Sequence, residues 1–197
     1  MACIASEFHL DAASIQAALL HDVVEDTPST GEDIKKKFGT QVAKLVDGLS
    51  KLDKVHFADD TEAQAENFRK MLLAMSQDVR VILIKLADRL HNMQTLEPLK
   101  PSKRRKISQE TSDIYAPIAN RLGLNNVYQE LEDLSFKYIH PLRYKTITKA
   151  ILASRGNRKE IIKKTLIAIK DKLEKSEIKA AITGREKNPA SIHRKML

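Results

Sequence analysis

The chain has 197 residues, 42% hydrophobic and 30% charged, a composition that favours a packed protein over a disordered one. It contains no apolar stretch long enough to span a bilayer. Its first ten residues lack lysine and arginine and do not match a secretory signal. Cys3 is the single cysteine, which excludes an internal disulfide framework and a cysteine-rich zinc module. We therefore expect a cytoplasmic protein that does not act in a membrane.

Positive charge is unevenly distributed along the chain. The formal net charge is +8, but residues 1–98 sum to −5 and residues 99–197 to +13. The acidic first half favours a metal or proton-transfer site, and the basic second half favours polyanionic partners such as nucleotides or RNA. The alternative is that the lysine-rich helix faces are simply solvated.

The first quarter of the chain is predicted to be helical. Apolar spacing indicates a helix over 12–20, and a turn over 27–31 places capping hydroxyls ahead of a helix that begins near Glu32. We interpret Gly39 and Gly48 as helix ends, because glycine commonly occupies the position just after a helix.

Helices are also predicted along most of the remaining chain. A long buried helix is expected over 79–93, although 79–84 alone would suit a strand by composition. Further helices are expected over 102–123, which glycine ends, and over 158–175. A short β-prone segment at 179–183 indicates that a strand begins there.

Polar residues gather where the helix over 12–20 ends. If that helix continues, His21, Asp22, Glu25 and Asp26 lie within about 140° of one another around its axis. An imidazole beside a carboxylate is a competent pair of ligands for a divalent metal, and the two further carboxylates are suited to proton transfer. A solvated helix end with scattered acids is the alternative for this cluster.

A second polar cluster lies on the long buried helix. Asp88, Asn92 and Thr95 are spaced by four and three residues and so share one face, with Lys85 and Arg89 at its edge. The apolar neighbours demand burial, so Asp88 needs a partner or a metal. It is either a third metal ligand, brought to the first cluster by helix packing, or one half of an ordinary ion pair with Arg89.

Two segments resemble the HD-type hydrolase domain of the Rel/SpoT alarmone enzymes. They are Leu20–Thr27, which reads LHDVVEDT, and Lys85–Met93, which reads KLADRLHNM. The resemblance continues in order through Gln64–Met71, Ile114–Gly123 and Glu130–Leu134. Gly184–Lys187, Ser191–Ile192 and Lys195–Met196 resemble the opening of the family's synthetase domain. On these motifs the chain is identified as a member of that family, covering its hydrolase region.

The resemblance implies a manganese-dependent 3′-pyrophosphohydrolase that acts on the guanosine alarmones ppGpp and pppGpp. His21, Asp22 and Asp88 match its metal ligands, and Glu25 and Asp26 match the pair that handles the water and its proton. The chemistry suits these residues, because a bound metal lowers the pKa of water and a nearby carboxylate accepts the proton. Relatives specialised for synthesis tend to lack both pairs, so their presence here indicates the hydrolysing or bifunctional branch of the family.

Further residues match positions that contact nucleotide in the family. Asn92 and Thr95 do so in the hydrolase region, and we add Lys85 and Arg89 to the predicted substrate-binding residues. In the synthetase-like segment the matching residues are Arg185, Lys187, Ser191 and Lys195. The acidic catalytic residues of synthesis would lie beyond Leu197, so we expect no synthesis by this chain alone.

The chain differs from the family pattern at its beginning, where a first histidine ligand and a basic helical segment have no counterpart. We do not expect His9, in a loop before the first helix, to replace that ligand, because metal sites tolerate little misplacement. We therefore expect weak or absent hydrolysis. We also expect apolar faces exposed around 15–20 and 81–90, which would favour self-association.

The predicted fold is all-α. An HD-type helical bundle is expected over 1–140, connector helices over 141–178, and the truncated start of an α/β synthetase domain over 179–197. The expected partners are guanine alarmones, with neither membrane nor direct nucleic-acid binding. Two other functions stay open: a catalytically inactive fragment that binds nucleotide or RNA for regulation, and an HD phosphohydrolase for a different nucleotide.

Overall fold

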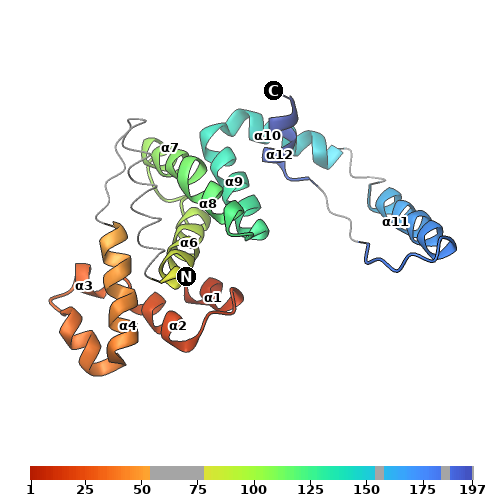
Figure 1. The fold of residues 1–197 in the computed structure, drawn as a ribbon. Helices are drawn as coiled ribbons and strands as arrows, with labels where there is room; N and C mark the ends of the chain where they lie inside the picture. Colours follow the sequence, from red (N-terminus) through yellow and green to blue (C-terminus); the bar gives the residue numbers. More distant parts are fainter. Residues whose placement is uncertain (54–77, 154–157, 183–186, 197) are drawn as a thin grey trace. The chain divides into compact units, whose positions relative to one another are not determined.

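A computed structural model describes residues 1–53, 78–153, 158–182 and 187–196 (Figure 1). The motif at 64–71 lies outside these ranges. The helices are α1 (Ala2–Glu7), α2 (Ala12–Leu20), α3 (Val23–Asp26), α4 (Gly31–Asp53), α6 (Val79–Gln94), α7 (Pro101–Glu110), the π-helix η1 (Thr111–Tyr115), α8 (Ala116–Arg121), α9 (Asn125–Ile139), α10 (Pro141–Ala153), α11 (Arg158–Lys175) and α12 (Pro189–Met196). The described ranges contain no strand, which confirms the all-α prediction for them.

The chain divides into two compact units, Met1–Ser135 and Phe136–Leu197. The predicted boundaries after residues 140 and 178 stay predictions. Residues 179–182 have no regular structure and Thr183 lies outside the described ranges, so the α/β start also stays a prediction. Among the described helices, none has the length and apolar character needed to cross a membrane.

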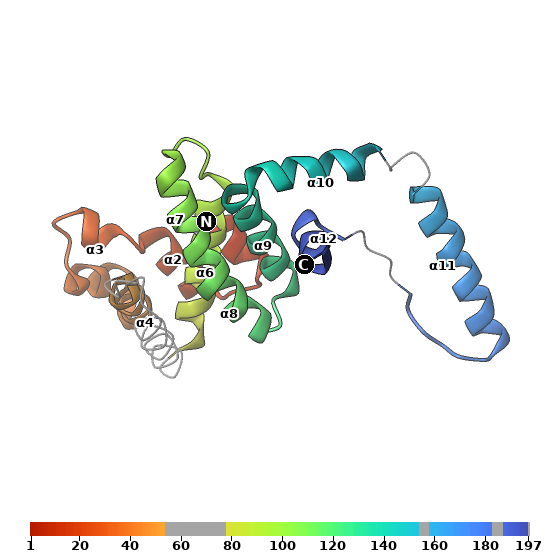
Figure 2. The same ribbon diagram turned by 90° about the horizontal axis from the view of Figure 1, so that it is seen from above.

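In the first unit, α6 is packed against α1, α2, α4 and η1. Figure 1 shows α6 beside α1 and α2, and Figure 2 shows it beside α2 from above. Its larger buried apolar side chains are Val81, Ile82, Ile84, Leu86, Leu90 and Met93, each worth about 1.5–3 kcal/mol relative to exposure. A helix satisfies its own backbone hydrogen bonds, so it tolerates burial on several sides even with β-branched residues. The predicted long helix is confirmed.

The predicted exposure of apolar residues is only partly correct. It is wrong for 81–90, because the neighbouring helices cover that face of α6. On α2, however, Leu19 is 67% exposed. Self-association stays a prediction, and only the exposed apolar surface around α2 now supports it.

Helix α4 begins where the sequence predicts. Thr30 N–H and Oγ1 donate to Asp33 Oδ2 at 2.9 and 2.7 Å, and Asp33 N–H donates to Thr30 Oγ1 at 3.3 Å, a reciprocal cap of the first turn. Gly39 interrupts the helix with φ 89°, a conformation that glycine adopts without a Cβ clash. The helix end predicted at Gly39 is therefore a break, after which the helix resumes.

Gly48 does not end a helix, and that prediction is wrong. The residue lies inside α4 where this helix packs against α6. A Cβ at position 48 would lie 2.9 Å from Val81 Cγ2. Glycine is needed here for a close approach of two helices, a requirement set by the partner helix rather than by local sequence.

The single helix predicted over 102–123 is divided into α7, η1 and α8. Pro117 has no N–H and cannot donate to the carbonyl of Asp113, as a continuous α-helix requires. The preceding turn is π-helical, and the buried Thr111 hydroxyl donates to the carbonyl one turn earlier at 2.7 Å. Gly123, with φ 76°, follows α8 and ends this region as predicted.

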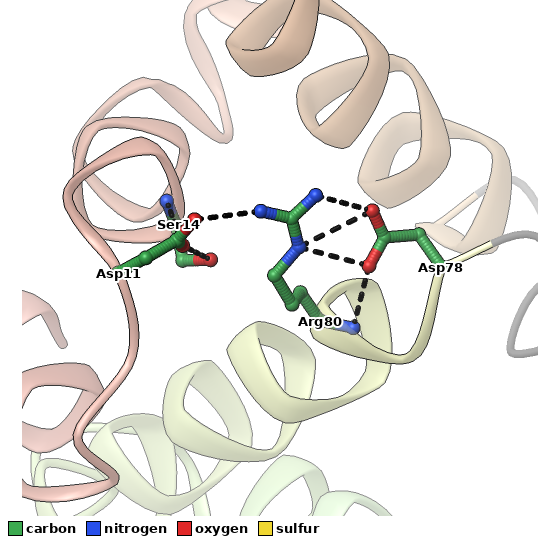
Figure 3. Close-up of polar contacts among 4 residues, drawn as sticks. All are labelled: Asp11, Ser14, Asp78 and Arg80. Atoms are coloured by element: carbon green, nitrogen blue, oxygen red, sulfur yellow. Dashed lines mark hydrogen bonds and ion pairs between the residues drawn. The ribbon is translucent and has the colours of Figure 1, made fainter.

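Arg80 joins the beginnings of two helices (Figure 3). Asp11 caps α2 by accepting from Ser14 N–H at 3.1 Å, and Asp78 caps α6 by accepting from Arg80 N–H at 3.0 Å. The guanidinium bonds to both carboxylates, with Nη1 2.7 Å from Asp11 Oδ2 and Nη2 2.6 Å from Asp78 Oδ2. The Arg80 hydrogen bonds lower the pKa of Asp78, and those of Ser14, followed by Arg80, lower the pKa of Asp11.

Replacing Gly48 with alanine is expected to destabilise the protein by about 1–3 kcal/mol, because the added methyl group meets Val81. Urea unfolding measures this change. Gly31→Ala is the matched control at the start of the same helix, where nothing lies within 4 Å of the added Cβ, and it should be neutral. Equal stability of the two variants would contradict the close packing of α4 on α6.

Asp78→Asn keeps a side chain that caps α6 but removes the charge that pairs with Arg80. The free energy of unfolding should fall by about 1 kcal/mol at pH 7, a value reduced for partial exposure. Because the folded-state pKa of Asp78 is lowered from its unfolded value of about 3.9, this stabilisation is present above about pH 4. It is lost as the pH falls through the folded pKa.

The difference between wild type and Asp78→Asn should therefore shrink in acid, which urea unfolding at several pH values would show. Asp47→Asn is the matched control, because it breaks an exposed pair with Lys51 at 2.6 Å and should change stability little at any pH. A constant difference from pH 7 to pH 2 would contradict the role given to the Asp78 charge.

Candidate metal and substrate site

His21 lies where α2 ends, and the helix itself orients its ring. Nδ1 is 3.0 Å from the carbonyl oxygen of Ala18. A carbonyl oxygen only accepts hydrogen bonds, so Nδ1 must carry a hydrogen. This contact selects the tautomer and leaves Nε2 to face the neighbouring carboxylates, an arrangement found around histidine ligands of metals.

Two carboxylates face His21 Nε2: Asp22 Oδ2 at 2.8 Å and Asp88 Oδ1 at 3.6 Å. Because Nδ1 already donates to a carbonyl, the shorter contact needs a hydrogen between Nε2 and Oδ2. Burial raises the pKa of Asp22; His21 and Lys85 act against that rise, and the Asp88 carboxylate adds to it. The packing of α2 against α6 thus brings the three predicted metal ligands together.

The chain after α2 does not continue the same helix, so the continuous helix assumed for the first cluster is wrong. Asp22, with φ −95° and ψ −3°, precedes the single turn of α3, and its carboxylate contacts His21 without capping that turn. Aspartate disfavours helix interiors because its side chain competes for local hydrogen bonds. Glu25 and Asp26 lie on α3 with exposed side chains, and their N–H groups donate to Asp22 O at 3.0 and 2.8 Å.

Asp88 is buried on α6, and both of its carboxylate oxygens are engaged. Its exposed fraction is 6% and that of Lys85 is 7%. Lys85 Nζ donates to Oδ2 at 2.9 Å, and Asn92 Nδ2 donates to Oδ1 at 3.1 Å. The expected need for a partner is confirmed. The alternative ion pair with Arg89 is wrong, because the observed partners are Lys85 and Asn92, three and four residues away on the same face of α6.

Asn92 and Thr95 lie toward the end of α6 with exposed side chains. The Asn92 amide nitrogen is engaged by Asp88. Thr95 is the residue that ends the helix, and its hydroxyl donates to the carbonyl oxygen of His91 at 3.0 Å. Both side chains are therefore accessible from solvent beside the buried carboxylate, as a nucleotide-contacting role requires.

Arg89 points to other helices. Its Nη2 lies 3.0 Å from Glu110 Oε1, and its guanidinium carbon lies 4.0 Å from the centre of the Tyr115 ring, a cation–π contact. Burial raises the pKa of the Tyr115 hydroxyl. These contacts join α6 to α7 and η1 and give Arg89 a structural role, and its predicted substrate contact stays a prediction. The sequence did not indicate Glu110 or Tyr115 as partners, because both lie more than 20 positions from Arg89 in the chain.

The residues of the synthetase-like segment belong to the second unit. Arg185 lies outside the described ranges. Lys187 and Lys195 are exposed, and Ser191 lies in the first turn of α12, where its N–H donates to Asn188 Oδ1 at 2.9 Å. Their nucleotide-binding role stays a prediction.

His9 lies in the turn between α1 and α2, exposed and with φ 55°. It precedes α2, whereas His21 follows it. Nine helical residues at about 1.5 Å each separate the two ends of α2 by about 14 Å. This position agrees with the expectation that His9 does not complete the His21 cluster.

The cluster supplies one imidazole and two carboxylates, a donor set that suits divalent first-row metals. By the chemistry of their donors, His21, Asp22 and Asp88 fit such an ion. In the part of the chain that the structure describes, no three His, Cys, Asp or Glu side chains are already spaced as a cation site. Asp88 is instead paired with the ammonium of Lys85.

Comparison with known proteins identifies the family. A family model described as an HD domain matches residues 1–125. The chain belongs to the HD domain family. All of the cluster residues of α2, α3 and α6 fall inside the matched range.

The whole chain is similar to parts of longer proteins. It is 54% identical over 197 residues to the bifunctional (p)ppGpp synthase/hydrolase SpoT of Escherichia coli (strain K12). It is 53% identical over 196 residues to the guanosine-3′,5′-bis(diphosphate) 3′-pyrophosphohydrolase of Haemophilus influenzae, and 45% identical over 196 residues to the GTP pyrophosphokinase rsh of Brucella ovis. The chain spans 28%, 29% and 26% of these relatives. The resemblance to the Rel/SpoT hydrolase region is confirmed.

Arg89→Gln is expected to lower the melting temperature by several degrees, because it leaves the partly buried Glu110 carboxylate without its guanidinium. Nucleotide affinity should change little once the variant is folded, which calorimetry below the melting temperature would test. Lys106→Gln, an exposed change on α7, is the control for general loss of charge. A large loss of nucleotide affinity with unchanged stability would instead restore the predicted substrate contact.

Proposed function

We propose that this HD domain hydrolyses the 3′-diphosphate of the guanosine alarmones ppGpp and pppGpp. One observation carries the proposal: α2 packs on α6 so that His21, Asp22 and Asp88 meet. They do so in a chain that is 54% identical, along its whole length, to a protein named for (p)ppGpp hydrolysis. Hydrolysis adds water, releases pyrophosphate and leaves a hydroxyl group on the ribose 3′-carbon.

His21, Asp22 and Asp88 would hold a divalent ion, for which we propose Mn²⁺. When bound, such an ion lowers the pKa of water and polarises a phosphoryl oxygen. Neighbouring groups already orient these ligands. The Ala18 carbonyl selects the His21 tautomer, and Asn92 donates to Oδ1 of Asp88, the oxygen that faces His21. This preparation is typical of metal sites, where neighbouring groups fix the ligand geometry.

Glu25 and Asp26 are proposed to handle protons. They lie on α3, directly after the His21–Asp22 pair, and their exposed carboxylates are free to accept a proton from water and to return one to the leaving oxygen. Asn92 and Thr95, accessible beside Asp88, are proposed to contact the nucleotide.

We also propose that the reaction takes place in the cytoplasm. The exposed and unpaired Cys3 is consistent with a reducing compartment. The basic charge of the second half of the chain, +13 over 99–197, is consistent with a polyphosphorylated nucleotide as the partner.

Mn²⁺ titration by calorimetry, followed by a pyrophosphate-release assay with ppGpp, tests the proposal. Asp88→Asn should abolish Mn²⁺ binding and turnover, because a ligand is lost. Glu25→Gln should keep Mn²⁺ binding and lower the rate by about 10²-fold or more, the usual contribution of a general base.

The control is Glu32→Gln, which neutralises an exposed acid on α4 and should change neither quantity. Equal pyrophosphate release by wild type and Asp88→Asn would contradict the proposal, as would faster hydrolysis of dGTP or cyclic dinucleotides. Nucleotide binding without release of pyrophosphate would instead favour the inactive regulatory fragment.

A further inference from the structure

Lys85 is an unusual residue for the interior of a domain. Its side chain is only 9% exposed, and its ammonium lies 2.9 Å from Asp88 Oδ2. Lysine is almost never fully buried unless it is paired, because removing a charge from water costs several kilocalories per mole. A lysine that only contacted substrate would not need this burial. The position therefore calls for a role in the buried cluster itself.

The two oxygens of Asp88 receive different partners. Oδ2 accepts from Lys85, while Oδ1 accepts from Asn92 at 3.1 Å and faces His21 Nε2 at 3.6 Å. Asn92 thus already orients the oxygen that faces the histidine. What Lys85 adds to this arrangement is mainly a positive charge on the far oxygen.

That charge also reaches the second carboxylate of the cluster. Asp22, beside His21, has its pKa raised chiefly by burial, with Asp88 adding to the rise, whereas Lys85 acts in the opposite direction. A cation in the place of Lys85 therefore offsets the repulsion between the two carboxylates. A divalent ion bound by the same acids would do the same.

We propose that Lys85 is a built-in counter-ion of the metal site, which neutralises Asp88 when no metal is bound and opposes the divalent ion when one binds. The inference rests on the proposed metal-dependent function. It makes Lys85 a positioning residue that sets metal affinity, in place of the substrate-binding residue that the sequence predicted.

The sign of the effect follows from two opposing contributions. Loss of a neighbour that orients a ligand commonly costs about 10–100-fold in metal affinity, but Asn92 retains most of that orientation here. Repulsion between an ammonium and a divalent ion a few ångström apart is worth roughly a hundredfold or more, even at an effective dielectric constant near 20. Removing the charge of Lys85 should therefore tighten metal binding.

The test compares wild type with Lys85→Met, which keeps the length of the side chain, by Mn²⁺ calorimetry and by melting temperature with and without Mn²⁺. The variant should bind Mn²⁺ roughly tenfold or more tightly. Without metal its melting temperature should fall by on the order of 10 °C, because the buried Asp88 loses the ammonium that neutralises it. Saturating Mn²⁺ should restore most of that loss.

Two further variants keep the test decisive. Lys85→Gln retains a neutral donor for Asp88 and should also bind Mn²⁺ more tightly, which covers the case in which Lys85→Met does not fold. Lys51→Met removes an exposed lysine that pairs with Asp47 and should change neither affinity nor stability appreciably.

This inference alone would be overturned if wild type binds Mn²⁺ and releases pyrophosphate but the Lys85 variants bind Mn²⁺ no more tightly than wild type. Absence of Mn²⁺ binding in both wild type and the Lys85 variants would overturn it together with the proposed function. Tighter Mn²⁺ binding in the variants without hydrolysis of ppGpp by wild type would support the counter-ion and contradict the hydrolase.

Discussion

Burial of α6 is the constraint from which the rest of the first unit follows. Among the described residues, α1, α2, α4 and η1 pack against this helix, and apolar residues fill most of its surface. Any ionic group on it must therefore find a partner inside the protein. Asp88 accepts hydrogen bonds from Lys85 and Asn92 on the same face of α6, and it faces His21 at the end of α2. The candidate site is thus the polar part of a packing interface.

Neighbouring residues on α6 have separate tasks because they point in different directions. Asp88 faces α2, whereas Arg89, one residue later and 100° around the axis, pairs with Glu110 and stacks on Tyr115. The π-helical turn that precedes Pro117 carries that tyrosine. One helix therefore presents a carboxylate to the site and anchors α7 and η1 with a guanidinium.

The two ends of α2 are held in different ways. At its beginning, Arg80 bonds to the caps of both α2 and α6, so the register between these helices is set by ionic hydrogen bonds. At its end, the Ala18 carbonyl orients the His21 ring. Together these contacts explain how a nine-residue helix can deliver a histidine to a carboxylate on another helix. The hydrophobic contacts between them provide stability but little directional information.

The sequence by itself determined what depends on local chemistry. The periodicity of α6, the capping residues of α4 and the pairing of polar types in the His21 and Asp88 segments were all readable, because each depends on neighbours within a turn or two. Tertiary structure decided the rest. Gly48 permits contact with Val81 and so does not end a helix, and Lys85 turns inward to a carboxylate. These outcomes depend on which helices meet and how closely, and a single sequence does not contain that information.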